Sequence, residues 1–431
     1  MLSTITRHTR TIVKSIHFQH LHWLASNSFC LNKLHCNAYR HTRGISFHTT
    51  INYLHLRWDD GDQSKYPFIF LRDNCQCEQC FHVTAMQRTC DVVGNFSVDI
   101  KPESTWLSDD GVTMEWEDGH RSSFSFKWLR ERMFPKSEKE IGSMSDCGLK
   151  PVTWGSELAE KIPKYEFVKV MQDNLVCLAW LESLGTTGLT LLRNNRQKSS
   201  EALLQISRRL QCSFTKTHYG EIFTLKNKPA ASNVAYTADR LALHTDVLYY
   251  QQRPGIQLLH CIEQCKGEGG ENYMVDGFKA AEELRLHEPE AFKLLSTIKL
   301  TFGDVGADKL GKFFKMSERT IISLDSFGMV DGIAENNAVK GSIIHAPAEQ
   351  VKKLYEAHDK LVKIFNKPEN VVTYKMEEGD TLVFNNNRVL HGRAGFAATS
   401  PRHLQGCYLS WDDVYCAIRV LRLAMGKNEI F

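Results

Sequence analysis

The alternation of hydrophobic and polar positions divides the chain into two pieces with different predicted structures. The first piece, 51–145, has short alternating runs that predict strands, at 66–71, 112–116 and 122–126. Asp118-Gly119 lies between the last two runs and is a strong hairpin signal. The stretch 135–146 is rich in Lys, Glu, Ser and Gly and indicates a linker. The first piece is therefore predicted to be a small β-rich domain.

The second piece, 150–431, combines a few helical patterns with many short apolar runs. Helical patterns lie at 174–184, 199–210, 277–286, 347–365 and 412–425. Strand-like runs lie at 188–192, 256–261, 272–275, 320–324, 371–374, 381–384 and 404–411. Many short strands with helices packed outside favour a mainly β fold with helices, a double-sheet jelly roll whose mouth can hold a metal and a small ligand.

The composition excludes some classes of protein but does not identify a function. The chain has 431 residues, 42% hydrophobic and 24% charged, which is ordinary for a globular protein with two cores. Its formal net charge of +3 is small, so no nucleic-acid surface is predicted. No run of eighteen apolar residues is present, so no membrane span is predicted. Thirteen cysteines, most of them isolated, fit a reducing compartment.

The N-terminal 58 residues contain no Asp or Glu but seven Lys or Arg. This basic stretch, mixed with Ser, Thr and His, is typical of a mitochondrial transit peptide. A secretory signal would need an unbroken apolar core, which 4–18 does not supply. We therefore expect 1–50 to be a transit-like presequence and the protein to act in the mitochondrial matrix. A basic tail retained in the cytoplasm is the alternative.

Three cysteines lie within six residues, Cys75, Cys77 and Cys80. Such density in a protein of a reducing compartment predicts a structural Zn²⁺, which needs a fourth ligand. His82, Cys90 and His120 are the candidates. We favour His120, because it opens the second strand of the Asp-Gly hairpin and approaches from outside the cysteine loop. The alternative is three reduced thiols without a metal, although exposed thiols would be susceptible to oxidation.

His244-Thr245-Asp246 places a histidine and a carboxylate two positions apart. On a strand these positions point to the same face and can bind one face of a metal ion. The pair alone is weak evidence, since about one is expected by chance in a chain of this length. Far down the chain, however, the Gly-Asp turn at 379–380 opens an apolar strand that leads to His391. Two histidines and one carboxylate form a facial triad with open positions, which suits Fe(II).

Arg402 follows His391 by eleven positions. A guanidinium can bind a carboxylate through two parallel hydrogen bonds. The co-substrate 2-oxoglutarate carries a carboxylate at the end opposite to its iron-chelating oxo-acid group. The triad with Arg402 therefore predicts a 2-oxoglutarate-dependent oxygenase that also uses O2.

Seven motifs from residue 70 to residue 404 together resemble the gamma-butyrobetaine dioxygenase family. They lie at 70–75, 233–236, 244–246, 255–261, 275–278, 390–393 and 402–404. The resemblance implies a double-stranded β-helix with Fe(II), 2-oxoglutarate, ascorbate as reductant, an N-terminal zinc domain and a homodimer. It also implies hydroxylation of gamma-butyrobetaine to L-carnitine, with release of succinate and CO2.

Two other functions remain open at the level of the sequence. Trimethyllysine dioxygenase shares most of the motifs, and the transit-like presequence favours it. The three-thiol cluster and Arg402-His403-Leu404 favour the butyrobetaine family. A catalytically inactive jelly roll that binds a betaine is the third possibility.

The resemblance also implies the substrate-binding residues. The aromatic cage for a trimethylammonium group would comprise Tyr219, Phe223, Tyr236 and Tyr408. Asn233 and Asn336 would bind the carboxylate of the substrate. The chain departs from the family pattern at Phe223, where Trp is usual and would be the stronger cation–π partner. It departs again at Asn385 and Asn387, where Asp and Trp are common, and the stretch from His391 to Arg402 is about two residues shorter.

Overall fold

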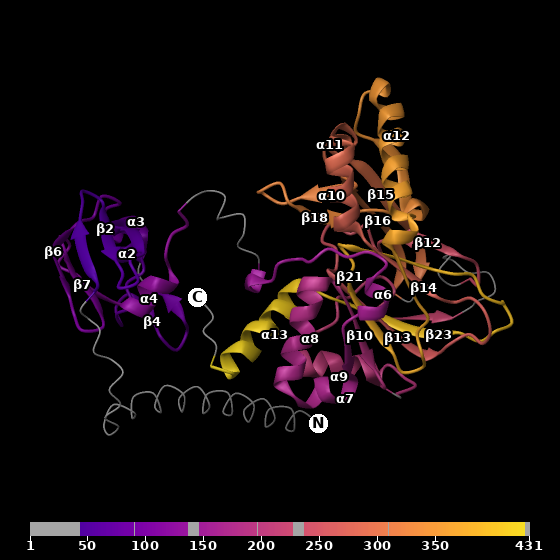
Figure 1. The fold of residues 1–431 in the computed structure, drawn as a ribbon, viewed down its shortest axis with the longest axis horizontal. Helices are drawn as coiled ribbons and strands as arrows, with labels where there is room; N and C mark the ends of the chain where they lie inside the picture. Colours follow the sequence, from indigo (N-terminus) through magenta and orange to yellow (C-terminus); the bar gives the residue numbers. More distant parts are fainter. Residues whose placement is uncertain are drawn as a thin grey trace. The chain divides into compact units, whose positions relative to one another are not determined.

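The computed structural model describes residues 44–89, 91–136, 146–195, 197–226, 237–308 and 310–426 (Figure 1). Residues 1–43 of the predicted presequence 1–50, together with Cys90, Asn233 and Tyr236, lie outside these ranges, and residues 46–49 of that predicted segment form a strand of the first unit. The chain divides into two compact units, one ending at Lys136 and the other beginning at Ser137. Among the described residues, no helix has the length and apolar character needed to cross a membrane.

The first unit contains two antiparallel three-stranded sheets. Their strands are β1 (Ser46–Thr49), β2 (Tyr53–Arg57) and β3 (Gln63–Pro67), then β6 (Pro102–Leu107), β7 (Gly111–Trp116) and β8 (Arg121–Ser125). The unit also has the short pair β4 (Phe81–His82) and β5 (Gln87–Arg88), and the helices α2 (Phe68–Asp73), α3 (Val92–Asn95) and α4 (Phe126–Glu131). Side chains from both sheets share one core, including Leu54, Tyr66, Met114 and Trp116.

The predicted strand at 66–71 is wrong beyond Pro67, because the chain turns there into helix α2. Proline has no N–H to continue a strand ladder but is compatible with the start of a helix. Phe68 and Leu71 are three positions apart and both are buried, so one helical face carries the apolar side chains. Apolar runs this short do not distinguish strand from helix. The cysteine cluster consequently follows a helix.

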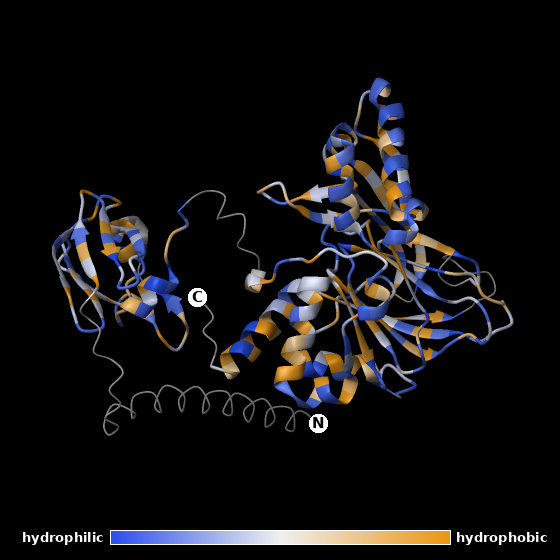
Figure 2. Cartoon of the chain, in the orientation of Figure 1, coloured by the Kyte–Doolittle hydropathy of each residue, from blue (hydrophilic) through white to orange (hydrophobic). Residues whose placement is uncertain are grey.

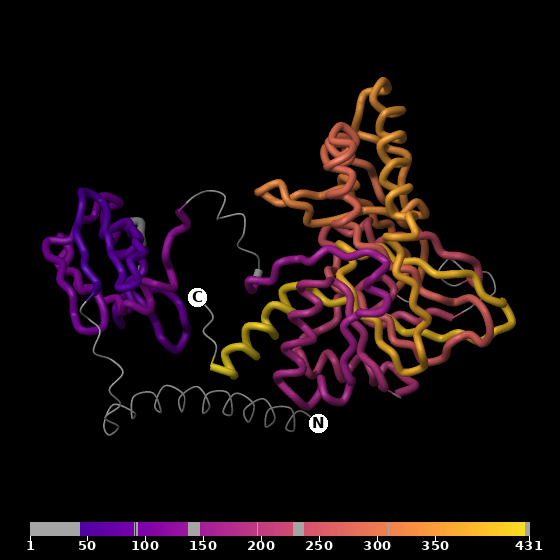
Figure 3. The backbone as a smooth tube through the Cα atoms, in the orientation of Figure 1, coloured from indigo at the N-terminus to yellow at the C-terminus, as the bar shows by residue number. Residues whose placement is uncertain are grey.

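The second unit is built on two facing sheets, which confirms the predicted double-stranded β-helix. The larger has the order β11 (Ile222–Lys226), β23 (His403–Leu409), β13 (Ile256–Glu263), β21 (Thr381–Asn385), β10 (Leu189–Arg193), β9 (Lys164–Glu166). The smaller has the order β12 (Leu241–His244), β22 (Val389–Arg393), β14 (Asn272–Asp276), β20 (Val371–Tyr374). Figure 3 shows that strands far apart in sequence lie side by side, as β13 does between β21 and β23. One core cluster joins both sheets, with Leu259 and Phe384 from the larger and Met274 and Val372 from the smaller.

Helices pack outside this scaffold. A second cluster joins the larger sheet to α7 (Phe167–Gln172), α8 (Asn174–Thr187), α9 (Glu201–Leu210) and α13 (Trp411–Ala424). A third joins α10 (Gly277–His287), α11 (Pro289–Thr297) and α12 (Ala348–Phe365) to β15 (Leu300–Asp308), β17 (Ile322–Leu324) and β18 (Val330–Ile333). The remaining described elements are α6 (Leu158–Lys161), β16 (Gly311–Arg319), β19 (Lys340–Ile344) and three short 3-10 helices at Asp146–Gly148, Asn337–Val339 and Pro368–Asn370. Figure 2 shows hydrophobic and hydrophilic residues mixed along α12, where Leu354, Ala357 and Leu361 are buried while Lys352, Glu356 and Lys363 are exposed.

Candidate active site

Three predicted iron ligands come together where β12 meets β22. His244 and His391 are directly opposite each other in the register of these two strands. His244 Nε2 lies 3.2 Å from Asp246 Oδ1, and His391 Nε2 lies 3.7 Å from Asp246 Oδ2. Single ligand atoms from all three residues lie within 4.8 Å of one another. This donor set of two imidazoles and one carboxylate fits Fe(II) with open positions.

The protonation of these residues also fits a metal site. His244 Nδ1 lies 2.8 Å from the carbonyl oxygen of Ala242, and a proton on Nδ1 leaves the Nε2 lone pair directed at the site. Burial by itself would raise the pKa of Asp246. His391 and His244 outweigh it and hold the pKa of this carboxyl well below its usual range. The carboxylate is therefore ionised, as a metal ligand must be.

Hydrogen bonds from two strands and one turn hold Asp246 in place. Gln257 Nε2 donates to Asp246 Oδ2 at 2.8 Å, and the Tyr408 hydroxyl donates to the same oxygen at 2.9 Å. Asn386, fully buried in the turn between β21 and β22, accepts from the backbone N–H of Asp246 at 2.8 Å. Its amide donates back to the Asp246 carbonyl oxygen at 3.1 Å. The two departures from the family pattern lie on either side of Asn386, and the Asn385 side chain accepts from the Asn387 backbone N–H within that turn.

We predict that Asn386→Ala raises the dissociation constant for Fe(II) by about 10- to 100-fold, because both backbone groups of Asp246 lose their buried partner. Asn386→Asp retains the acceptor and is expected to have a smaller effect. An anaerobic titration with Fe(II) measures both, and Asn174→Ala, which changes an exposed asparagine at the start of α8, is the matched control. Unchanged iron affinity in Asn386→Ala contradicts this assignment.

Arg402 is buried in the same unit, with 7% of its surface exposed. Its Nε has no hydrogen-bond partner, and no carboxylate of the described residues forms an ion pair with it. Burial lowers the pKa of Arg402, an effect that the nearby thiols of Cys261 and Cys265 oppose. A buried guanidinium without an anion is costly unless a ligand supplies one. The residues present therefore fit a co-substrate that ends in a carboxylate.

A cavity of about 560 Å³ opens beside the iron ligands. Its aromatic wall contains three predicted cage residues, Tyr219, Phe223 and Tyr408. The rings of Phe223 and Tyr408 are 5.3 Å apart, and those of Tyr219 and Phe223 are 6.4 Å apart. Tyr249 completes this wall, with its hydroxyl 3.4 Å from that of Tyr219. Tyr249 was not among the residues predicted from the sequence, although its place three residues after Asp246 was a signal.

The predicted carboxylate-binding asparagines receive little support. Asn233, like the cage residue Tyr236, lies outside the described residues. Asn336 does line the cavity, but its amide donates to the Thr245 carbonyl oxygen at 3.3 Å and its side-chain oxygen accepts from the Ala338 N–H. Its polar atoms thus serve the local backbone.

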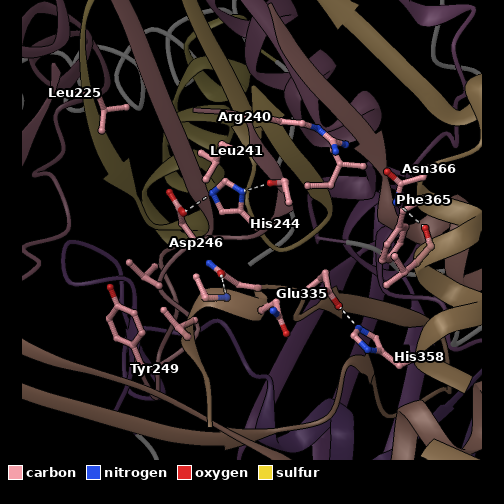
Figure 4. A pocket seen from close by; sticks show the side chains of 18 of the residues that line it. Leu225, Arg240, Leu241, His244, Asp246, Tyr249, Glu335, His358, Phe365 and Asn366 are labelled. Carbon is pink, nitrogen blue, oxygen red and sulfur yellow. Dashed lines mark hydrogen bonds and ion pairs between the residues drawn. The ribbon is translucent and has the colours of Figure 1, made fainter. Parts of the chain in front are cut away.

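The α12 side of the cavity carries charged residues that the sequence analysis also missed. Glu335 Oε2 and His358 Nε2 are 2.6 Å apart, and both residues line the cavity (Figure 4). Arg240 lines it as well and is exposed. Figure 4 shows His358 on the α12 side and Tyr249 on the opposite side of Asp246. The cavity therefore has an aromatic end and a charged end, with the iron ligands between them.

A second group of metal-binding side chains lies in the first unit. The Sγ atoms of Cys75, Cys77 and Cys80 are 3.3, 3.4 and 3.5 Å from His120 Nε2. Ligand atoms around a tetrahedral zinc, at the usual Zn–S and Zn–N lengths, are separated by roughly 3.5 Å. The structure thus brings together the four residues that the sequence favoured, and the alternative ligand His82 is not among them. Arg72 donates to Cys80 Sγ at 3.5 Å and offsets the negative charge of thiolates there.

Comparisons with known proteins find matches to both units of the chain. The family model "Gamma-butyrobetaine hydroxylase-like, N-terminal" matches 45–130, and "Taurine catabolism dioxygenase TauD, TfdA family" matches 151–408. Gamma-butyrobetaine dioxygenase from Homo sapiens is 35% identical over 376 residues, 86% of this chain and 94% of that protein. The enzyme of the same name from Pseudomonas sp. (strain AK-1) is 31% identical, over 85% of this chain and 93% of that protein. Mitochondrial trimethyllysine dioxygenase from Mus musculus is 28% identical, over 95% of this chain and 92% of that protein.

Proposed function

This chain belongs to the TauD, TfdA family of dioxygenases and to its gamma-butyrobetaine dioxygenase branch, and from that membership we propose that it hydroxylates gamma-butyrobetaine to L-carnitine. It is an Fe(II)- and 2-oxoglutarate-dependent dioxygenase, so a hydroxylation would release succinate and CO2. A catalytically inactive jelly roll is not supported, since all three iron ligands and Arg402 are in place.

The aromatic wall carries the proposal. A trimethylammonium group cannot donate a hydrogen bond, so a protein recognises it through aromatic faces, at roughly 0.5 to 2 kcal/mol for each good contact. The rings of Phe223 and Tyr408 are 5.3 Å apart, and the Tyr408 hydroxyl donates to Asp246, so this wall lies next to the iron ligands. Burial raises the pKa of Tyr249, so its ring stays a neutral phenol. A substrate with a cationic head at this wall presents its chain to the iron ligands.

Different residues of the chain would bind the metal, hold its carboxylate ligand in place and position the substrate. Iron held by His244, Asp246 and His391 would supply the activation of O2 and the cleavage of a C–H bond. Gln257 and Tyr408 keep the Asp246 carboxylate in place. The cavity walls determine which carbon of the substrate lies nearest to the metal, and that choice fixes the product.

One observation favours trimethyllysine as a second candidate substrate. Trimethyllysine has the same cationic head but carries an α-ammonium and an α-carboxylate at its other end. Glu335 at the charged end of the cavity suits an ammonium group, and Arg240 suits a carboxylate. Gamma-butyrobetaine has no ammonium group for Glu335.

The test is turnover by the full chain with each substrate, in the presence of Fe(II), 2-oxoglutarate, ascorbate and O2, with the hydroxylated product identified by mass. We expect carnitine from gamma-butyrobetaine, and we expect Glu335→Gln to leave this activity within about twofold of the parent. Turnover of trimethyllysine alone, lost in Glu335→Gln, would instead establish the second candidate. Glu356→Gln, on the exposed face of α12, is the matched control.

We further propose that the protein acts in the mitochondrial matrix as a homodimer, with ascorbate as the reductant that keeps iron in the Fe(II) state. The acid-free, basic N-terminal stretch supports the location. Import of the full chain into isolated mitochondria tests the location, and sedimentation equilibrium tests the dimer.

A further inference from the structure

Two buried arginines lie over one phenylalanine ring in the segment that connects the iron site to the co-substrate site. Arg393 ends strand β22, two residues after His391, and Arg402 precedes β23. The guanidinium carbon of Arg393 is 5.0 Å from the centroid of the Phe396 ring. That of Arg402 is 5.7 Å from the same centroid. Both distances are within the range of a cation–π interaction.

The two arginines are held in different ways. Arg393 is 4% exposed, and its Nη2 donates to the carbonyl oxygens of Thr237 and Asp239, each at 2.7 Å. Burial lowers the pKa of Arg393 to about 10, and the charge of Arg402 contributes to this decrease. Arg402 forms no such backbone hydrogen bonds among the described residues, and the Phe396 ring is a contact that can orient its guanidinium there.

The backbone fixes the position of the ring. The Phe396 N–H donates to the Ala238 carbonyl oxygen at 3.0 Å, and Phe396 forms an isolated β-bridge with Gly269. This bridge needs a glycine, because a Cβ at Gly269 would lie 2.0 Å from the Gly395 carbonyl oxygen and φ is +87° there. These contacts fix the backbone of Phe396 within the loop between β22 and β23.

We propose that Phe396 is a positioning residue for 2-oxoglutarate. Its ring holds the Arg402 guanidinium where the distal carboxylate of 2-oxoglutarate binds, and it holds Arg393 close enough to add a second positive charge to that place. The ring acts through Arg402, so it matters only for a ligand that has the distal carboxylate. The proposal rests on the 2-oxoglutarate dependence of the family and is independent of the identity of the substrate.

Binding experiments without turnover test this role. The full chain, loaded with Mn(II) in place of iron, is titrated by calorimetry with 2-oxoglutarate and with 2-oxopentanoate, in which a methyl group replaces the distal carboxylate. Phe396→Leu is expected to raise the dissociation constant for 2-oxoglutarate by about fivefold to tenfold. The constant for 2-oxopentanoate is expected to change by less than about twofold. Phe396→Tyr keeps the π face and is expected to retain the affinity of the parent.

The control is Phe314→Leu, which makes the same change at an exposed phenylalanine of β16. Equal weakening of both ligands by Phe396→Leu would mean that the ring only shapes the loop, and the proposal would be wrong. Unchanged binding of 2-oxoglutarate would also overturn it. Phe396→Met supplies the same test if the leucine variant does not fold. Because the titrations contain no substrate to be hydroxylated, a negative result for Phe396 does not bear on the proposed hydroxylation of gamma-butyrobetaine.

Discussion

Replacement of Arg402 by leucine is expected to raise the KM for 2-oxoglutarate by about 100-fold or more. The variant removes a buried cation with which no carboxylate of the described residues forms an ion pair, so the distal carboxylate of the co-substrate loses its partner. Truncating one partner of a buried, hydrogen-bonded charge pair costs roughly 2 to 5 kcal/mol, and each 1.4 kcal/mol corresponds to a factor of ten in affinity. Steady-state rates of succinate formation over a range of 2-oxoglutarate concentrations measure the change.

The pattern of kinetic constants identifies the cause. Loss of a contact to the co-substrate raises its KM while the KM of the second substrate stays close to that of the parent. Arg419→Leu, at an exposed arginine of α13, is the matched control and is expected to change neither constant. A parent-like KM for 2-oxoglutarate in Arg402→Leu would show that another group binds the distal carboxylate.

The iron ligands and Arg402 could be predicted from the sequence because their geometry is local. His244 ends β12 and Asp246 follows it by two positions, while His391 is the middle residue of β22 and Arg402 directly precedes β23. The zinc ligands share this property, since three of them lie within six residues. Short spacing on a regular element fixes the direction of a side chain before any tertiary contact is known.

The missed residues of the cavity depend on contacts between distant segments. Glu335 reaches the cavity from the segment after β18, and its partner His358 comes from the middle of α12. The role of Asn386 could not be predicted from the sequence either, because Asn386 acts through hydrogen bonds to Asp246, which is 140 positions away. No local pattern marks such residues.

The hairpin of β15 and β16 was missed for another reason. Its strands hold glycines and charged residues, and burial does not alternate along β15. In β16 burial alternates from Phe313 onward, but Phe314 and Met316 occupy exposed positions, so hydrophobic and polar residues do not alternate in the sequence. Period-two alternation arises only where one face of a strand is covered. The prediction of a strand at 66–71 was wrong beyond Pro67 for a different reason. This stretch is a continuous apolar run, and either a strand or a helix can bury such a run.

Replacement of Cys80 by serine is expected to release zinc from the first unit and to unfold most of that unit. Metal binding to structural sites of this kind contributes roughly 10 kcal/mol in peptides that fold around zinc. The four ligands connect the end of helix α2 to the start of strand β8, so the metal would link two parts of a small core. Without a metal, burial raises the pKa of the Cys80 thiol to about 12, and a neutral thiol adds no comparable bond.

Zinc content by elemental analysis and urea unfolding followed by tryptophan fluorescence provide the measurement, because Trp116 belongs to the core of the first unit. His120→Ala is expected to behave like Cys80→Ser, while His82→Ala is expected to keep both the metal and the stability of the parent. The second unit has its own core and should unfold in a separate transition at an unchanged urea concentration. A parent protein that contains no zinc, together with a Cys80→Ser variant of unchanged stability, would leave the cluster as three reduced thiols.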